Sequence, residues 1–481
     1  MRRLASDSLI YGLGSVANQA LAILLLPLYT RFLTPADYGS LALISAAGAV
    51  LGLAAALGVN SGLTRIFFLY ESGEERASMV FTALVFAVGA SVATGVVLSL
   101  LTPDLRPLVF SGADGDTVVR LAIWIYCIAA VNAVALGTLQ VHGMPRPYVL
   151  CSAAGLLVSM LCSIYLVAFA HHGVVGVLQG QLAGITVQLG LATSFSLPRM
   201  RPVLHLRALR EMLAFSIPIL PTSLFAWGLG LADRWSLKEF ASLTEVGLYA
   251  LGYRFGAVLD TLFVAPFTLA WYPYFYSISH QPDHRDICAR VLEYYTFLGG
   301  CLVLALDLFG GDVIRLIATP AFYSAKQVIF WIGLGSLFRG MTFLTGTGMN
   351  VVRKNQYSVP VYGAGLALNL ALLFVLVPRF GMMGAAFAVV LTYAAINAGF
   401  WVVSQRVYPI PFRPRKIAVL IAVLLGLHGL GGVAGEVDGL VALPLKVGCL
   451  GLFPLILFAA RFFDARDVTR VREIVRRITP A

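Results

Sequence analysis

Residues 79–101 read MVFTALVFAVGASVATGVVLSLL, an uncharged run of the length that a helix needs to cross a membrane. About 20 apolar residues span the hydrocarbon core of a bilayer, at a rise of roughly 1.5 Å per residue. The Gly, Ser and Thr residues within the run are typical of membrane helices that pack closely together. The stretch therefore predicts one transmembrane helix of a helical bundle.

Runs of this kind fill the rest of the chain. Of its 481 residues, 59% are hydrophobic and only 12% are charged, whereas a soluble domain carries about 25% charged residues. The composition excludes a soluble multidomain protein, a disordered chain and a secreted disulfide scaffold. We predict an all-α polytopic membrane protein with fourteen transmembrane helices. They lie near 8–30, 41–63, 79–101, 119–140, 149–169, 174–196, 213–232, 247–270, 292–310, 327–348, 357–377, 383–404, 416–433 and 441–460.

The basic residues predict the orientation of the chain in the membrane. With the N-terminus in the cytoplasm, most of the 34 Lys and Arg residues fall in cytoplasmic loops, as the positive-inside rule requires. Both termini are therefore predicted to be cytoplasmic, and the net charge of +11 is explained without nucleic acid. The tail at 462–481 interleaves arginines with valine and isoleucine, which predicts an amphipathic helix on the anionic inner leaflet.

Two halves of the sequence resemble each other. Gly39 and Gly247 occupy matching positions at the second and eighth predicted spans, and they are 208 residues apart. Gly173 and Gly381 precede the sixth and twelfth spans at the same separation of 208 residues. Landmarks in a single register indicate an internal repeat.

The repeat predicts the domain organisation. We expect a six-helix bundle at 1–205 and a second at 206–412. Because six spans return the chain to its starting side, the two bundles are predicted to be related by an axis along the membrane normal. The thirteenth and fourteenth helices, at 413–461, have no counterpart in the repeat and form an appendage.

Charged residues at membrane depth are candidates for function, because each costs about 2.5–3.5 kcal/mol to insert at the bilayer centre. Arg254, Asp260 and Arg339 fall within predicted spans. Each has an alternative interpretation as part of a structural ion pair or as a side chain that snorkels to the interface. Asp233, Asp260 and Asp307 are candidates to bind a coupling Na⁺ or H⁺, although Asp307 could instead pair with Arg315.

Neutral polar residues accompany these charges. Individually, Asn and Gln side chains in membrane helices more often join helices than bind ligands. Together with the arginines they predict a wet, cationic interior, which suits an anionic substrate because guanidinium binds phosphate bidentately. The candidates for the polar lining of a cavity are Asn18, Asn60, Gln140 and Asn369.

Signs of catalysis or metal binding are scarce. The chain has no Walker A loop and no GxGxxG, HExxH or GxSxG motif. Its six cysteines form no CxxC pair and mostly lie in apolar runs, so we interpret them as small buried hydrophobes. We therefore predict a protein that is not an enzyme and that binds no organic cofactor or metal.

Short motifs distributed along the chain indicate a family. Residues 26–39 read LPLYTRFLTPADYG, and residues 378–386 read PRFGMMGAA. Between them lie Phe215–Pro218, Asp233 with Arg234, and Val246–Tyr249. This order resembles the polysaccharide transporter family, the bacterial lipid-linked oligosaccharide (O-antigen type) flippases of the multidrug/oligosaccharidyl-lipid/polysaccharide exporter superfamily. The resemblance covers nearly the whole chain.

The resemblance implies a fold and a function. It implies two six-helix bundles around a central cavity, with two further helices. It also implies translocation of an undecaprenyl-diphosphate-linked glycan from the inner to the outer leaflet of the bacterial plasma membrane, by alternating access and without ATP hydrolysis. Expected partners are that glycan, membrane lipids, and polymerase and other polysaccharide-assembly proteins. By position, binding of the diphosphate would fall to Arg31, Arg65, Arg234, Arg254 and Arg339.

Three alternatives stay open. A cation-coupled multidrug exporter of the same superfamily would favour twelve spans and an acidic pocket. A lipid II flippase is a relative of the family. A membrane-bound glycosyltransferase or ligase would need paired acids near a membrane face and usually a large outer loop, whereas the longest predicted outer loop, near 102–118, is short.

Overall fold

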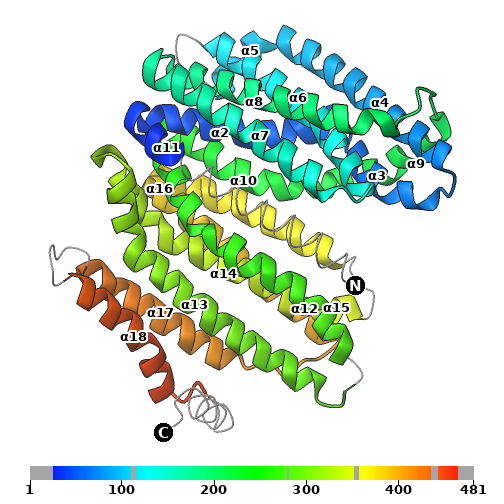
Figure 1. Ribbon diagram of the computed structural model, residues 1–481. Coiled ribbons are helices and arrows are strands. Elements are labelled where there is room, and N and C mark those ends of the chain that lie inside the picture. The colour runs from blue at the N-terminus through cyan, green and yellow to red at the C-terminus, as the bar shows by residue number, and fades with distance from the viewer. Residues whose placement is uncertain (1–24, 110–114, 279–280, 352–356, 435–441, 464–481) are drawn as a thin grey trace, which may run out of the picture. The chain divides into compact units, whose positions relative to one another are not determined.

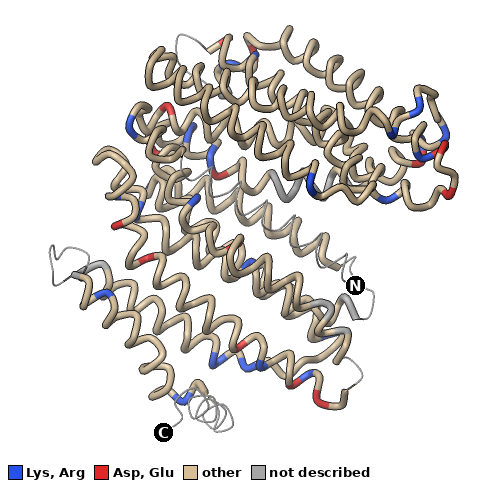
Figure 2. Tube along the Cα trace, viewed as in Figure 1, with Lys and Arg blue, Asp and Glu red and all other residues tan. Residues whose placement is uncertain are grey.

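A computed structural model describes residues 25–109, 115–278, 281–351, 357–434 and 442–463 (Figure 1). Within these ranges the chain forms helices and turns and no strand, which confirms the predicted all-α fold. Ten helices there are long and apolar enough to cross a membrane, and Leu443–Ala459 is a shorter apolar helix. Figure 2 shows that most of the helical length carries no charge.

The predicted fourteen spans are compatible with this arrangement. One long element, α16 (Ser358–Val407), contains both the eleventh and the twelfth predicted span. Gly381 divides it, because its φ of 53° and ψ of −131° leave the helical region and favour glycine. Most of the first predicted span, with Asn18, and the tail from residue 464 lie outside the described residues.

Two compact units make up the chain. Unit 1 comprises residues 1–250 and 317–322, and unit 2 comprises residues 251–316 and 323–481. The predicted repeat boundary between residues 205 and 206 rests on the sequence landmarks and stays a prediction.

Unit 1 contains a set of apolar helices joined by short turns. Its described helices are residues 25–32, α2 (Pro35–Ala55), α3 (Val59–Ile66), α4 (Gly73–Leu100), α5 (Thr102–Val109), α6 (Gly115–Val141), α7 (Pro145–Ile164), α8 (Gly173–Ser196), α9 (Leu206–Ser216), α10 (Leu220–Phe240) and the first part of α11 (Leu243–Gly256). Short turns of other helix types, η1 (Phe67–Leu69), η2 (Tyr165–Phe169), η3 (Leu197–Arg199) and η4 (Ile217–Ile219), connect some of them. Pro218 lies in η4, the 3₁₀ turn between α9 and α10.

The start of α2 shows why a helix begins where the sequence places it. The Asp37 backbone N–H donates to the Thr34 hydroxyl over 3.2 Å, and the Thr34 backbone N–H donates to the Asp37 carboxylate over 3.0 Å. This reciprocal capping box satisfies two backbone donors, and Pro35 supplies a helical φ at the first position. The stretch at 26–39, which carries the resemblance to the family, thus contains a helix start.

The two repeat-related glycines meet in unit 1. A Cβ on Gly39 would collide with the Leu243 carbonyl oxygen, and a Cβ on Gly247 would collide with the Pro35 carbonyl oxygen. Each obstructing residue lies four positions before the partner glycine, so the contact is reciprocal. Only glycine permits helices α2 and α11 to approach this closely.

Unit 2 contains longer helices and one π-helical turn. Its elements are the end of α11, η5 (Asp260–Val264), α12 (Ala265–Ile278), α13 (His284–Ile317), η6 (Pro320–Val328, which begins in unit 1), α14 (Ile329–Thr345), α15 (Thr347–Val351), α16, α17 (Pro414–Ala434) and α18 (Ala442–Ala459). Figure 1 shows α13, α17 and α18 side by side. The predicted appendage is therefore packed along α13.

Candidate functional site

An ion pair lies inside unit 2, between the π-helical turn η5 and α14. The Arg339 guanidinium contacts the Asp260 carboxylate, and the Ser336 hydroxyl donates a 2.9 Å hydrogen bond to the same carboxylate. The Asp260 side chain is 16% exposed, whereas the Arg339 side chain is 39% exposed. The acid is therefore the buried member, and part of the guanidinium can still meet an anion.

The surroundings of this pair are unusual for a membrane helix. Asp260 opens the π-helical turn, a rare element that is frequent at functional sites. The Tyr295 ring stacks on Phe263 with ring centres 4.8 Å apart. A Cβ on Gly340 would overlap the Tyr295 hydroxyl, so α14 and the ring are in close contact there. The ion pair thus lies beside a tightly packed aromatic wall.

Arg254 lies on the same helical path as Asp260. It is half-buried in α11 and precedes Asp260 by six residues, or about 9 Å at roughly 1.5 Å per residue. Unit 2 therefore holds two of the five predicted diphosphate-binding arginines, Arg254 and Arg339.

The other three arginines, Arg31, Arg65 and Arg234, lie in unit 1. Arg31 is exposed at the end of the helix that precedes α2. Arg65 places its guanidinium 4.8 Å from the centre of the Phe215 ring. Arg234 donates a 2.6 Å hydrogen bond to the Gly230 carbonyl oxygen.

Asp233 is a buried acid of unit 1. Its Oδ2 accepts a 3.0 Å hydrogen bond from the Tyr249 hydroxyl, while its buried Oδ1 has no hydrogen-bond partner among the described residues. Asp233 therefore differs from Asp260, whose partner is a cation. Its predicted role in binding a coupling ion stays a prediction.

The neutral candidates have separate surroundings. The Asn60 amide oxygen is buried against Gly137 of α6, and a Cβ on that glycine would overlap it. Gln140 is exposed at the end of α6. The Asn369 amide donates a 3.1 Å hydrogen bond to the Thr392 hydroxyl and so joins the two parts of α16. Asn369 fits the role of joining helices better than that of lining a cavity.

Helix α13 carries acids that pair with bases of the appended helices. One carboxylate oxygen of Glu293 lies 3.2 Å from the Lys416 ammonium nitrogen, and the other lies 3.6 Å from the Arg413 guanidinium. Asp307 lies 2.7 Å from His428 Nδ1, and Asp312 lies 2.6 Å from Lys446. Asp307, a predicted coupling-ion candidate, thus has a histidine partner.

A pocket of about 450 Å³ opens in unit 2 between α13, α14, α16 and α17. Its polar groups are few. The Asn397 amide oxygen accepts a 2.8 Å hydrogen bond from Thr345, and the Trp401 indole N–H is buried with no hydrogen-bond partner among the described residues. The lining residues are Leu292, Phe338, Met341, Thr345, Ala394, Asn397, Ala398, Trp401, Phe412, Pro414, Ile417, Ala418, Ile421, Ala422 and Leu425. The pocket suits an apolar chain.

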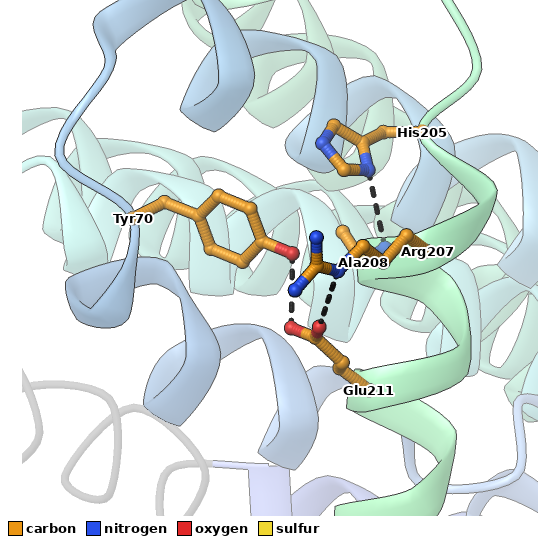
Figure 3. A network of polar contacts seen from close by, with 5 residues as sticks. All are labelled: Tyr70, His205, Arg207, Ala208 and Glu211. Atoms are coloured by element: carbon orange, nitrogen blue, oxygen red, sulfur yellow. Dashed lines mark hydrogen bonds and ion pairs between the residues drawn. The ribbon is translucent and has the colours of Figure 1, made fainter.

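A polar network at one end of unit 1 ties α9 to the turn before α4 (Figure 3). The Tyr70 hydroxyl donates a 2.9 Å hydrogen bond to Glu211, and Arg207 donates to the other Glu211 oxygen over 3.1 Å. The His205 imidazole accepts a 3.1 Å hydrogen bond from the Ala208 backbone N–H and so caps α9. Partial burial and the Glu211 carboxylate raise the pKa of the Tyr70 phenol. This network fastens the segment before α4 to α9.

Three site residues are absent from the sequence prediction: Glu293, His428 and Lys446. Each is an ionisable residue within a predicted apolar span, so a stricter search for lone charges at membrane depth would have found all three. Their partners lie more than 120 residues away in the chain. The pairing itself requires the structure.

The long apolar helices of the described residues define a polytopic membrane protein, and charged groups lie within several of them. Residues 28–326 match the family described as polysaccharide biosynthesis protein. Because this match covers more than half of the chain, the protein belongs to that family. A comparison with curated proteins gives no match.

Solved structures share the fold. The lipid II flippase MurJ in an inward closed conformation has a TM-score of 0.71 at 12% identity, over 94% of this chain and 99% of MurJ. An inward-facing multidrug resistance MATE family transporter of the MOP superfamily has a TM-score of 0.67 at 14% identity, over 81% of this chain and 94% of the transporter. A MOP superfamily transporter from Pyrococcus furiosus has a TM-score of 0.53 at 15% identity, over 84% of this chain and 95% of its own. Identities this low establish the fold alone.

Proposed function

We propose that this protein moves an undecaprenyl-diphosphate-linked oligosaccharide of the O-antigen type from the inner to the outer leaflet of the bacterial plasma membrane. It does so by alternating access and without hydrolysing ATP. Membership of the polysaccharide biosynthesis family supports a glycan substrate. The fold shared with MurJ and a MATE transporter supports movement through a helical bundle. The observation that carries the proposal is the apolar pocket of unit 2, because a free sugar would gain nothing from such a wall.

The pocket suits part of a long isoprenoid chain. Its volume of about 450 Å³ falls within the roughly 300–1,000 Å³ of small-molecule sites, so one segment of the lipid occupies it and the rest stays in the bilayer. Ala398 lines the pocket and is exposed on the surface of α16, so the pocket opens sideways. A lipid can enter from the membrane by this route.

Arginine supplies the binding of the diphosphate. The partly exposed Arg339 guanidinium presents donors in a fixed fork, and Arg254 adds a second cation on the neighbouring helix. In this proposal Arg31, Arg65 and Arg234 contact the same anion at other stages of transport. Both termini lie in the cytoplasm, and the polymerase and other polysaccharide-assembly proteins receive the exported glycan.

Lipid II is the second candidate substrate. The fold is shared with the lipid II flippase MurJ over 94% of this chain, which is why lipid II is the alternative. Lipid II and an O-antigen unit share the undecaprenyl diphosphate and differ in the sugar. The chemical identity of the trapped intermediate therefore separates the two.

The test is accumulation of lipid-linked glycan in a deletion strain that carries plasmid-borne variants. Ala398→Phe fills the pocket and is expected to trap glycan on the cytoplasmic leaflet and to lower export at least several-fold. Val402→Phe is the matched control, because Val402 is 46% exposed on the same helix and does not line the pocket. Normal leaflet distribution of every undecaprenyl-linked glycan in the deletion strain would refute the proposal.

A further inference from the structure

His428 and Asp307 form a pair that the proposed transport step does not use. His428 lies on α17 and Asp307 on α13, with 2.7 Å between the imidazole Nδ1 and the carboxylate Oδ2. Their side chains are 27% and 13% exposed, so both are largely removed from solvent. The His428 ring stacks on Phe330 with ring centres 3.8 Å apart and planes at 7°. Ring stacking and the carboxylate together hold the imidazole in one orientation.

The chemistry of the pair selects its ligand. No group of three His, Cys, Asp or Glu residues in the described part of the chain could hold a metal ion. Sodium prefers oxygen ligands, whereas one of the two groups here is a ring nitrogen. Histidine is the side chain whose charge changes near neutral pH, and an adjacent carboxylate stabilises the charged form. The ligand that fits is a proton.

The other charged groups near this end of the helices do not replace the pair. Asp312 and Lys446 contact each other over 2.6 Å, five residues further along α13. Arg315 follows on α13, and Lys326 packs its side chain against Gly311. Lysine and arginine keep their charge across the physiological range, so His428 is the group on these packed helices suited to change charge there.

We infer that His428 and Asp307 form a proton-binding site whose occupancy regulates the lipid pocket of unit 2. The link to the pocket is α17 itself. Leu425, which lines the pocket, precedes His428 by three residues, and Pro414, Ile417 and Ile421 of the same helix line it further along. The inferred regulation rests on the proposed function, because the proposed function is what places a lipid in the pocket.

The effect of the proton follows from electrostatics. With His428 neutral, α17 is held to α13 at this point by one hydrogen bond to a poorly solvated carboxylate. With His428 protonated, the same contact becomes a charge pair in a low-dielectric environment and is stronger. Protonation therefore fastens the wall that α17 contributes to the pocket, and loss of the proton loosens it.

Trp331 reports the charge on His428. The indole and imidazole ring centres are 5.4 Å apart, and an imidazolium quenches indole fluorescence more strongly than a neutral imidazole does. We expect the purified full-length protein to lose fluorescence reversibly on acidification. Trp331→Phe and His428→Gln are both expected to abolish this component. Asp307→Asn is expected to move its midpoint, because it removes the carboxylate that contacts the imidazole.

Asp312→Asn is the matched control, because it breaks the adjacent ion pair on the same helices without removing the titrating group. It should retain the wild-type midpoint. The proton site is refuted if the fluorescence change persists in His428→Gln, or if Asp312→Asn shifts the midpoint as far as Asp307→Asn does.

A second measurement connects the site to transport. Glycan export by the wild type should vary with pH, and export by His428→Gln should vary less over the same range. Equal pH dependence of the two would refute the coupling even if the fluorescence titration succeeds. The titration needs no substrate, so it reads the proton site even if the proposed glycan function fails.

Discussion

One helix contact in unit 1 and one set of contacts in unit 2 are made by different means. At the crossing of α2 and α11 in unit 1, Gly39 and Gly247 bring two backbones together without any charge. Along α13 in unit 2, Glu293, Asp307 and Asp312 each face a basic residue of α17 or α18. Close backbone packing depends on shape and is insensitive to pH, whereas charge pairs respond to protons and anions. We therefore expect the crossing of α2 and α11 to be rigid, and the charge pairs of α13 with α17 and α18 to respond to ligands.

The glycine crossing should be the most sensitive point to added volume. Gly247→Ala places a methyl group against the Pro35 carbonyl oxygen, a backbone atom that cannot rotate away. Overpacking costs typically about 1–3 kcal/mol, and we expect this variant at or above the upper limit because backbone must move. The thermal midpoint and the yield of monodisperse protein in detergent would measure it.

A matched glycine keeps this test specific. Gly190 of α8 has open space where its Cβ would be, so Gly190→Ala should be neutral or stabilise by up to about 1 kcal/mol. A Gly247→Ala protein as stable as Gly190→Ala would show that the crossing is not a close backbone contact.

The Asp260–Arg339 pair should have the next largest effect. Arg339→Ala leaves a buried carboxylate without its cation, and breaking a fully buried pair costs roughly 3–5 kcal/mol. Because Arg339 is 39% exposed, we expect a smaller loss of stability than that. Glycan export should fall further than stability does, since the guanidinium is also the proposed anion contact.

A double variant separates the two roles of Arg339. Asp260→Asn combined with Arg339→Gln removes both charges and should recover most of the stability lost in Arg339→Ala. Export should stay low, because the anion contact is still missing. If export recovers together with stability, Arg339 is structural and does not bind the diphosphate.

The fold could be predicted from the sequence because a membrane helix is recognisable from its own residues alone. An apolar run of about 20 residues needs no partner to be recognised, and the capping box at Thr34 and Asp37 marks a helix start within four residues. The repeat offset also predicted matching positions for Gly39 and Gly247, although their direct contact is visible only in the structure.

The site was less accessible to prediction because its contacts join distant segments. Asp260 was identified as a lone acid at depth, but Arg339 and Ser336 come from another helix. His428 is one residue in an apolar run, and its partner Asp307 is 121 residues away. Spacing along one helix predicts which of its residues share a face, but it does not predict which other helix packs against that face. The pocket has no signature in the sequence, since its lining residues are ordinary, mostly apolar residues of four helices and of the segment before α17.

The smallest effect is expected where charge lies outside the membrane helices. In the network of α9, Arg207 is 83% exposed, so Arg207→Gln should change stability by about 0–1 kcal/mol.

Tyr70→Phe removes a hydrogen bond to Glu211 and should cost about 0.5–1.5 kcal/mol at neutral pH. The pKa of the Tyr70 phenol is raised in the folded protein, so this contribution is complete below the ordinary phenol pKa of about 10 and is lost as pH rises through the folded value. Chemical unfolding of wild type and Tyr70→Phe should therefore differ at pH 7 and converge in strong alkali. A difference that persists unchanged there would mean that the hydroxyl stabilises the fold by some means other than the hydrogen bond it donates to Glu211.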